Sequence, residues 1–164
     1  MAGEIDGDFG VFMIGMRISR WCKHWSWLPI LLAMPRMLKE LAQHPELGCL
    51  GSEPGLGVVL QYWRSFEALE GYARSRDAQH LPAWLAFNRR VAASGDVGIW
   101  HETYLVTAGR YEAFYSAVPP RGLGKAGRLV PATGSRATAA GRLGSPPAAH
   151  RNHENETPDA PSRR

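Results

Sequence analysis

The sequence predicts an α+β fold of the ferredoxin-like type, in which helices cover one face of an antiparallel sheet. Strand-like and helix-like segments follow the order strand, helix, strand, strand, helix, strand, strand. A helix between two strands of one sheet implies a crossover, and two such units build this fold. The chain has no aromatic residue from Pro119 onward. We therefore expect one folded domain over residues 10–118, a flexible N-terminus over residues 1–9, and a disordered tail over residues 119–164.

The first strand and the first helix follow from apolar patterning and capping residues. Residues 10–18 are apolar at nearly every position, which is typical of a strand buried on both faces. Ser26 is a suitable N-cap, and Pro29 falls within the first turn. Apolar residues then recur at helical spacing to Gln43. Pro35 inside this segment predicts a kink.

The remaining elements are marked by turn residues and by alternation of side chains. Ser65 is a suitable cap for a short helix, and a second helix is predicted from Leu81 to Ala93. Further strands are predicted at residues 48–51, 58–63, 97–106 and 111–118. The last two strands are separated by the tight turn at residues 107–110 and predict a β-hairpin.

Charge and cysteine usage narrow the possible partners. The tail holds eight Arg and Lys against three acids, so its net charge is +5 and the body carries −1. The basic isoelectric point therefore gives no support to nucleic-acid binding by the domain. Cys22 and Cys49 lack metal-site spacing. The N-terminus is acidic, and the longest apolar run, residues 27–35, is too short to span a bilayer. We expect a cytoplasmic protein without membrane, metal or nucleic-acid partners.

The sheet face that points away from the helices is also expected to be apolar. It would carry Val58, Leu60 and Tyr62, together with Trp100 or Ile99. An apolar face of this kind must be covered. We expect a second copy of the chain to cover it, as a twofold homodimer.

Four polar residues are the main candidates for chemistry, and some of them have a structural alternative. His80 stands at the start of a predicted helix, where the imidazole is held neutral and could act as a base, bind a metal, or simply cap and pack. His101 and Glu102 are neighbours on a strand and must point to opposite faces. Arg17 could form a structural ion pair with Glu102, or could stabilise an oxyanion in a pocket.

Several aromatic residues could be core, or could together line a flat apolar pocket for a small molecule with Glu102 at its edge. These are Trp63, Tyr72, Trp84, Trp100, Tyr104 and Tyr115.

Four segments carry a resemblance to a known family: YWRSFEALEGYAR, AWLAFNRRV, SGDVGIWHETYLV and YEAFYSAVPPRGLG. They resemble a small bacterial family of monooxygenase-like proteins, related to the antibiotic-biosynthesis monooxygenase superfamily of dimeric α/β barrels and to a fungal monooxygenase of the fumagillin pathway. The resemblance covers about residues 11–124. It implies a ferredoxin-like protomer, a homodimer, and a pocket between sheet and helices. Quinone-forming members oxidise aromatic polyketides with dioxygen and carry no metal or flavin.

Haem-degrading members of the superfamily bind iron through a histidine on the second helix, with a Trp and an Asn elsewhere. His80 lies near the position of that histidine, whereas Tyr72 stands where the Trp would be, and residues 10–18 contain no Asn.

The resemblance thus implies a cofactor-independent monooxygenase for an apolar aromatic or polyene molecule. His80 or His101 would be the base, and Arg17 or Arg64 the cation. The alternatives are a haem-binding or haem-degrading protein with His80 as ligand, and a non-catalytic small-molecule-binding dimer.

Overall fold

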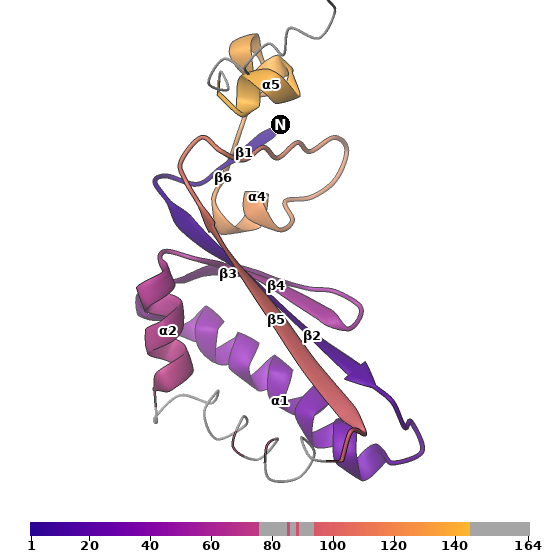
Figure 1. Ribbon diagram of the computed structural model, residues 1–164. Helices are drawn as coiled ribbons and strands as arrows, with labels where there is room; N and C mark the ends of the chain where they lie inside the picture. The colour runs from indigo at the N-terminus through magenta and orange to yellow at the C-terminus, as the bar shows by residue number, and fades with distance from the viewer. Residues whose placement is uncertain (76–84, 86–87, 89–93, 145–164) are drawn as a thin grey trace, which may run out of the picture.

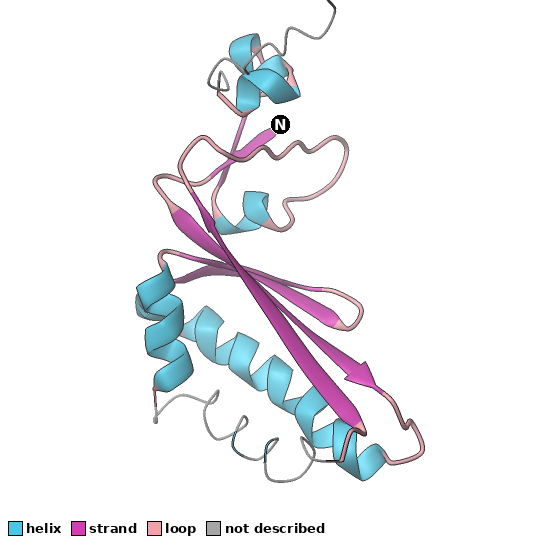
Figure 2. Ribbon diagram, in the orientation of Figure 1, coloured by secondary structure: helices cyan, strands magenta, loops and turns pink. Residues whose placement is uncertain are grey.

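The computed structural model describes residues 1–75, 85, 88 and 94–144. Its centre is a four-stranded antiparallel sheet in the order β3-β4-β2-β5 (Figures 1 and 2). The strands are β2 (Phe9–Ile18), β3 (Cys49–Pro54), β4 (Val58–Trp63) and β5 (Val97–Val106). Helix α1 (His24–Gln43) follows β2, and helix α2 (Phe66–Arg74) follows β4. This is the ferredoxin-like strand order, and it confirms the predicted fold class.

Both helices lie on the same face of the sheet, which we call the helix side (Figure 1). The core on this side is a cluster of Leu41 from α1, Trp63 from β4, and Leu69 and Tyr72 from α2. The Trp63 side chain is 0% exposed, so it is the largest fully buried group among the described residues. Alternate residues of β2, beginning with Phe12, complete the layer. Burial of these side chains is the main force that holds the helices on the sheet.

The helix starts agree only in part with the prediction. Ser65 caps α2 as expected, because its hydroxyl accepts a hydrogen bond of 3.2 Å from the Ala68 amide. Helix α1 begins two residues before the predicted cap Ser26, with Lys23 as N-cap and no side-chain cap bond. The Lys23 ammonium instead lies 2.9 Å from the Asp96 carboxylate, which ties the helix start to the start of β5.

The predicted hairpin between β5 and residues 111–118 is wrong. The turn itself forms, with the Arg110 amide 3.0 Å from the Thr107 carbonyl. The chain then pairs with the N-terminal strand β1 (Ala2–Glu4) rather than with β5: the Gly3 amide donates to the Ala113 carbonyl at 3.0 Å. Residues 111–118 form no strand of their own, and only an isolated bridge joins Phe114 to Ala2. Alternation of apolar residues does not specify a pairing partner.

The predicted boundaries are also wrong at both ends of the domain. Residues before 10 form β1, and residues after 118 form α4 (Leu123–Ala126), β6 (Arg128–Val130) and α5 (Ala139–Arg142). Strand β1 pairs antiparallel with β6. We call β1, residues 111–115, α4, β6, η3 (Gly134–Ala137) and α5 the terminal unit. Residues 145–164 lie outside the described part of the chain.

The terminal unit needs few apolar residues because it extends an existing core. Leu123 is buried in one cluster with Ile5, Phe9 and Tyr62. Tyr111 packs edge-on against Phe9 at 5.0 Å between ring centroids. Composition averaged over residues 119–164 hides such anchors, because one leucine on a preformed surface can order a short segment.

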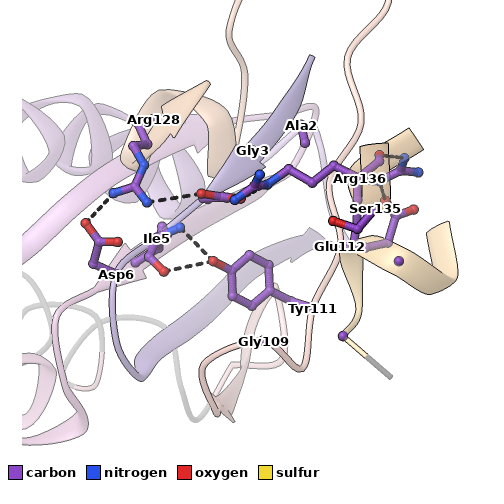
Figure 3. A pocket seen from close by; sticks show the side chains of 14 residues that line it. Ala2, Gly3, Ile5, Asp6, Gly109, Tyr111, Glu112, Arg128, Ser135 and Arg136 are labelled. Atoms are coloured by element: carbon purple, nitrogen blue, oxygen red, sulfur yellow. Dashed lines mark hydrogen bonds and ion pairs between the residues drawn. The ribbon is translucent and has the colours of Figure 1, made fainter. Parts of the chain in front are cut away.

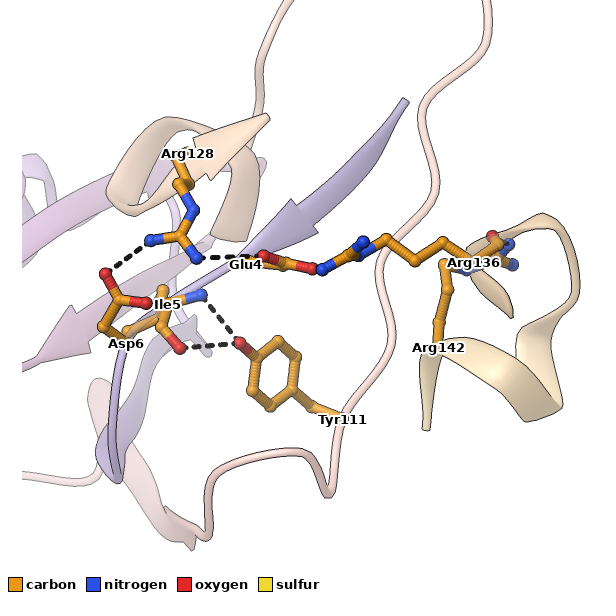
Figure 4. A network of polar contacts seen from close by, with 7 residues as sticks. All are labelled: Glu4, Ile5, Asp6, Tyr111, Arg128, Arg136 and Arg142. Atoms are coloured by element: carbon orange, nitrogen blue, oxygen red, sulfur yellow. Dashed lines mark hydrogen bonds and ion pairs between the residues drawn. The ribbon is translucent and has the colours of Figure 1, made fainter. Parts of the chain in front are cut away.

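Ion pairs join the two ends of the chain within the terminal unit (Figure 4). The Glu4 carboxylate accepts from Arg136 at 2.6 Å and from Arg128 at 3.0 Å, and Arg128 also reaches Asp6 at 2.5 Å. The bond from Arg136 is the main reason why the pKa of Glu4 lies below its ordinary value. We call these four residues the terminal ion-pair network.

Within the described residues, no helix combines the length and the apolarity that crossing a membrane requires.

The terminal ion-pair network predicts that Glu4→Gln loosens the terminal unit. Because two charge-assisted bonds are lost, amide exchange in β1 and β6 should be roughly tenfold faster. The pKa of Glu4 is lowered in the folded chain, so its contribution is full above the unfolded pKa and disappears as pH falls through the folded one. Native-state hydrogen exchange measures both effects. Glu70→Gln, which breaks an exposed pair with Arg74, is the control. Equal exchange in wild type and Glu4→Gln would contradict this account.

Candidate functional site

A row of aromatic and ionisable side chains lies on the helix side of the sheet. His101 of β5 stands opposite Ile14, and its ring lies 5.6 Å from that of Phe12. Phe12 packs against the core cluster that contains Trp63 and Tyr72, whose rings are 5.7 Å apart. We call His101, Phe12, Trp63, Tyr72 and the carboxylate bonded to Tyr72 the aromatic row.

That carboxylate is Glu40, on the last turns of α1. The Tyr72 hydroxyl donates a hydrogen bond of 2.7 Å to the Glu40 Oε2 atom. Burial of the phenol raises the pKa of Tyr72 far above its ordinary value, and the bond to Glu40 adds to the shift. Tyr72 is therefore held as a neutral phenol that donates its hydrogen bond to Glu40. The sequence reasoning missed Glu40, although it is the first acid after Asp8 and stands in an apolar helix.

Two polar side chains, Gln61 and Cys49, lie near Trp63 beside its apolar neighbours. Its indole N–H donates to the Gln61 side-chain oxygen at 3.0 Å. The Cys49 thiol lies at the same end of the sheet, and burial raises its pKa. Cys49 is thus held as a neutral thiol rather than as a nucleophilic thiolate.

A different set of predicted site residues lies on the opposite face of the sheet, which we call the outer side. Trp100, Glu102 and Tyr104 alternate along β5 with the helix-side residues. The Trp100 ring lies over Gly15, where any Cβ atom would collide with it. The Tyr104 hydroxyl donates to the Glu102 carboxylate. This bond raises the pKa of Tyr104.

The suggested ion pair between Arg17 and Glu102 is wrong. In the antiparallel register Arg17 stands opposite Gly98, whereas Glu102 stands opposite Met13, four residues further along β5. No ion pair between the two is found in the part of the chain that the structure describes. Both side chains are exposed, so neither charge needs the other.

The structure therefore divides the predicted residues between two faces. His101, Trp63 and Tyr72 lie on the helix side. Arg17 shares the outer side with Trp100, Glu102 and Tyr104, so Arg17 and His101 cannot line one pocket. As predicted, His101 and Glu102 point apart.

Tyr115 is not part of either group of residues on the sheet faces. Its hydrogen bonds hold the terminal unit together. Its hydroxyl donates to the Arg121 carbonyl at 2.9 Å and accepts from the Gly124 amide at 2.7 Å. Residues 121–126 cover part of the outer side, where Ala126 closes on Gly51 and Arg121 bonds Glu53 at 2.6 Å. The chain itself thus covers the outer side over β3, whereas Trp100, Glu102 and Tyr104 of β5 are exposed.

The other candidates have less defined surroundings. Arg64 directly follows β4 and is exposed, and its guanidinium lies 3.4 Å from the Pro45 carbonyl. His80 and Trp84 lie outside the described residues.

A separate cavity of about 320 Å³ opens in the terminal unit (Figure 3). Its lining is polar, with Glu4, Asp6 and Glu112 facing arginines. Each arginine is bonded to one of these carboxylates, including Arg142 to Glu112 at 2.8 Å. The charges of the cavity are compensated by one another.

In the described ranges, no group of three or more His, Cys, Asp or Glu side chains could hold a metal ion.

Comparison with known families gives one match. A family model described as Monooxygenase af470-like matches residues 9–123, which include the whole four-stranded sheet. No curated protein matches the chain.

Three solved structures are similar to this chain, and the first two show its fold. Two are of aldoxime dehydratase: one, a complex with butyraldoxime, has 18% sequence identity and the other 22%, each with a TM-score of 0.52 over 62% of this chain. The match covers 32% and 33% of those proteins, so it spans about a third of their length. The third is a conserved protein of unknown function from Bacteroides thetaiotaomicron, described as a possible oxidoreductase, with 8% identity and a TM-score of 0.42 over 62% of this chain and 99% of that one.

The buried Tyr72–Glu40 bond predicts a stability loss for Tyr72→Phe of about 1 kcal/mol at neutral pH. The pKa of Tyr72 is raised in the folded chain, so its stabilising effect is full below the unfolded pKa of 10.0 and falls as pH rises above it. Urea unfolding at neutral and alkaline pH should show a steeper alkaline loss in wild type than in Tyr72→Phe. Tyr104→Phe removes an exposed phenol–carboxylate bond and is the matched control. Equal stability of Tyr72→Phe and wild type at every pH would refute the role of the bond.

Proposed function

Because the chain belongs to the Monooxygenase af470-like family, we propose that it is a cofactor-independent monooxygenase acting on an apolar aromatic or polyene small molecule. The family membership itself supports an oxidative or small-molecule-binding role. The observation that supports the finer proposal is the aromatic row, in which the exposed His101 lies beside Phe12, and Phe12 packs on the core that holds the phenol–carboxylate pair.

The reaction requires a base, an electron-rich substrate and a place without water. A base removes a proton from an activated C–H bond of the substrate, and the resulting anion gives electrons to dioxygen. One oxygen atom stays in the product as a carbonyl, and the other leaves as water with two hydrogens from the substrate. His101 is our candidate base, because it is the imidazole of the aromatic row.

The remaining members of the row have supporting roles in the proposal. Tyr72 donates a hydrogen bond to a developing enolate oxygen or keeps Glu40 in place. Phe12, which is half-buried, supplies an apolar surface against which a flat substrate stacks, and the buried Trp63 supports it from the core. Arg17 is not assigned to the reaction, because it lies on the outer side. His80 remains a second candidate base.

We also propose that the protein is a homodimer that pairs through β5 and the outer side. Strand β5 ends the sheet order and has a free edge of ten residues. Its outer-side aromatic side chains are exposed, Trp100 at 40% and Tyr104 at 50%. Exposed edges of this length are normally covered, and a second copy covers two edges at once.

Oxygen consumption with an anthrone-type substrate tests the enzyme proposal. If His101 is the base, His101→Ala should lower the rate about 100-fold, within the usual range for loss of a general base. His44→Ala, at an exposed histidine that lies 2.7 Å from Glu46, should leave the rate unchanged. His80→Ala shows whether the base is His80 instead.

A titration of the same preparation with haemin separates the haem alternative. If haemin added to the wild type shows no shift of its Soret band, haem ligation by His80 is excluded. The same conclusion follows if the wild type and His80→Ala show equal shifts. Absence of oxygen uptake by the wild type with any enolisable aromatic would contradict the monooxygenase proposal and favour a binding protein.

Sedimentation velocity tests the dimer. Tyr104→Lys places like charges near the proposed twofold axis, so the dimer should dissociate about tenfold more readily. Leu56→Lys changes a fully exposed leucine on the β3–β4 turn and serves as the control. A wild type that stays monomeric, or an unchanged dimer in Tyr104→Lys, would refute this interface.

A further inference from the structure

Helix α1 exposes large apolar side chains on the side that faces away from the sheet. Trp27 and Ile30 point inward and pack around Val97 of β5. Trp25 is nevertheless 63% exposed, and Leu28 and Leu32 on the same stripe are also exposed. Their spacing of three and four residues places them along one line of the helix surface.

Trp21, just before the helix, extends this stripe. Its side chain is 68% exposed. It is held in place, because the Trp27 indole donates to the Trp21 carbonyl at 3.0 Å and the two rings lie 5.7 Å apart. We call Trp21, Trp25, Leu28 and Leu32 the α1 apolar stripe.

Basic residues bracket the stripe, and no acid interrupts it in the sequence. Between Asp8 and Glu40 the chain contains no Asp or Glu. Five cations fall in this stretch, namely Arg17, Arg20, Lys23, Arg36 and Lys39. Arg36 and Lys39 continue the line of the stripe toward the helix C-terminus and are exposed.

The carboxylate that pairs with these cations does not neutralise all of their charge, so the stretch keeps a net positive charge. Asp96 neutralises one charge at the helix start, where it lies 2.9 Å from Lys23 and 3.6 Å from Arg20. The exposed face of α1 thus combines tryptophan and leucine side chains with cations at both ends. A surface of this composition matches the interfacial layer of a bilayer with anionic lipids, where indole rings sit at headgroup level and cations meet phosphate.

We propose that the α1 apolar stripe docks the protein on a membrane surface that carries anionic lipids. Helix α1 would lie in the plane of the surface, with Trp21 and Trp25 in the headgroup layer and Arg36 and Lys39 against lipid phosphates. Docking on the surface of a membrane differs from spanning the bilayer. A short apolar segment cannot cross a bilayer but can rest on it. The proposal does not depend on the proposed enzymatic function, since binding is measured without substrate.

Vesicle sedimentation of the full chain tests the proposal. One set of vesicles contains phosphatidylcholine alone, and the other also contains phosphatidylglycerol. We expect the wild type to bind the anionic vesicles, with a blue shift of tryptophan fluorescence, and to be released by added salt. Trp25→Ser combined with Leu32→Ser should weaken binding about tenfold or more, because two anchoring side chains are lost.

Two matched variants separate the apolar from the electrostatic part. Arg36→Gln with Lys39→Gln should weaken binding several-fold, whereas Arg110→Gln with Lys125→Gln, which removes two exposed cations elsewhere, should not. Leu56→Ser is the control for loss of an exposed leucine. Circular dichroism and thermal unfolding confirm that each variant is folded.

Two results would overturn the proposal. One is a wild type that stays in the supernatant with both kinds of vesicle. The other is undiminished binding by the folded Trp25→Ser, Leu32→Ser variant. A loss of self-association in that variant, with no vesicle binding by the wild type, would assign the stripe to a protein interface and equally refute membrane docking.

Discussion

The register of strand β2 is the constraint on which the other features depend. β2 is hydrogen-bonded on both edges, and Ile14 stands opposite His101 on one side and Val59 on the other. A slip of β2 by one residue would move each of its side chains to the opposite face of the sheet. Two contacts oppose such a slip. Phe9 is buried in the cluster with Tyr62 at one end, and Gly15 leaves room for Trp100 near the other.

This register gives the two faces of the sheet different tasks in our account. The helix side holds the aromatic row, where the Tyr72 hydroxyl is hydrogen-bonded to Glu40 beside the buried Trp63. The outer side is covered over β3 by the chain's own residues 121–126 and exposes β5. The proposed chemistry and the proposed self-association thereby lie on different faces, so a change at Tyr104 is expected to weaken the proposed dimer without touching the aromatic row. Helix α1 adds a third surface, because its inner side packs on the sheet and its outer side is apolar.

Local sequence patterns predicted the elements well and their partners poorly. Alternation and capping located the four sheet strands and the start of α2 at Ser65, because these signals act within a few residues. The separation of His101 from Glu102 followed from strand geometry alone. The partner of residues 111–118 and the distance between Arg17 and Glu102 required a register, which local patterns do not contain. Glu40 was missed because a single acid in an apolar helix is indistinguishable from a surface residue until Tyr72 is placed beside it.

The register of β2 can be observed directly in a nuclear Overhauser spectrum of the aromatic and methyl protons. The account predicts cross-peaks between the rings of His101 and Phe12, and between Trp63 and Tyr72, because these pairs lie 5.6 Å and 5.7 Å apart. Cross-peaks from the His101 ring to outer-side protons such as those of Met13, with none to Phe12, would show that the two faces are exchanged. That result would contradict the assignment of the site and the interface together.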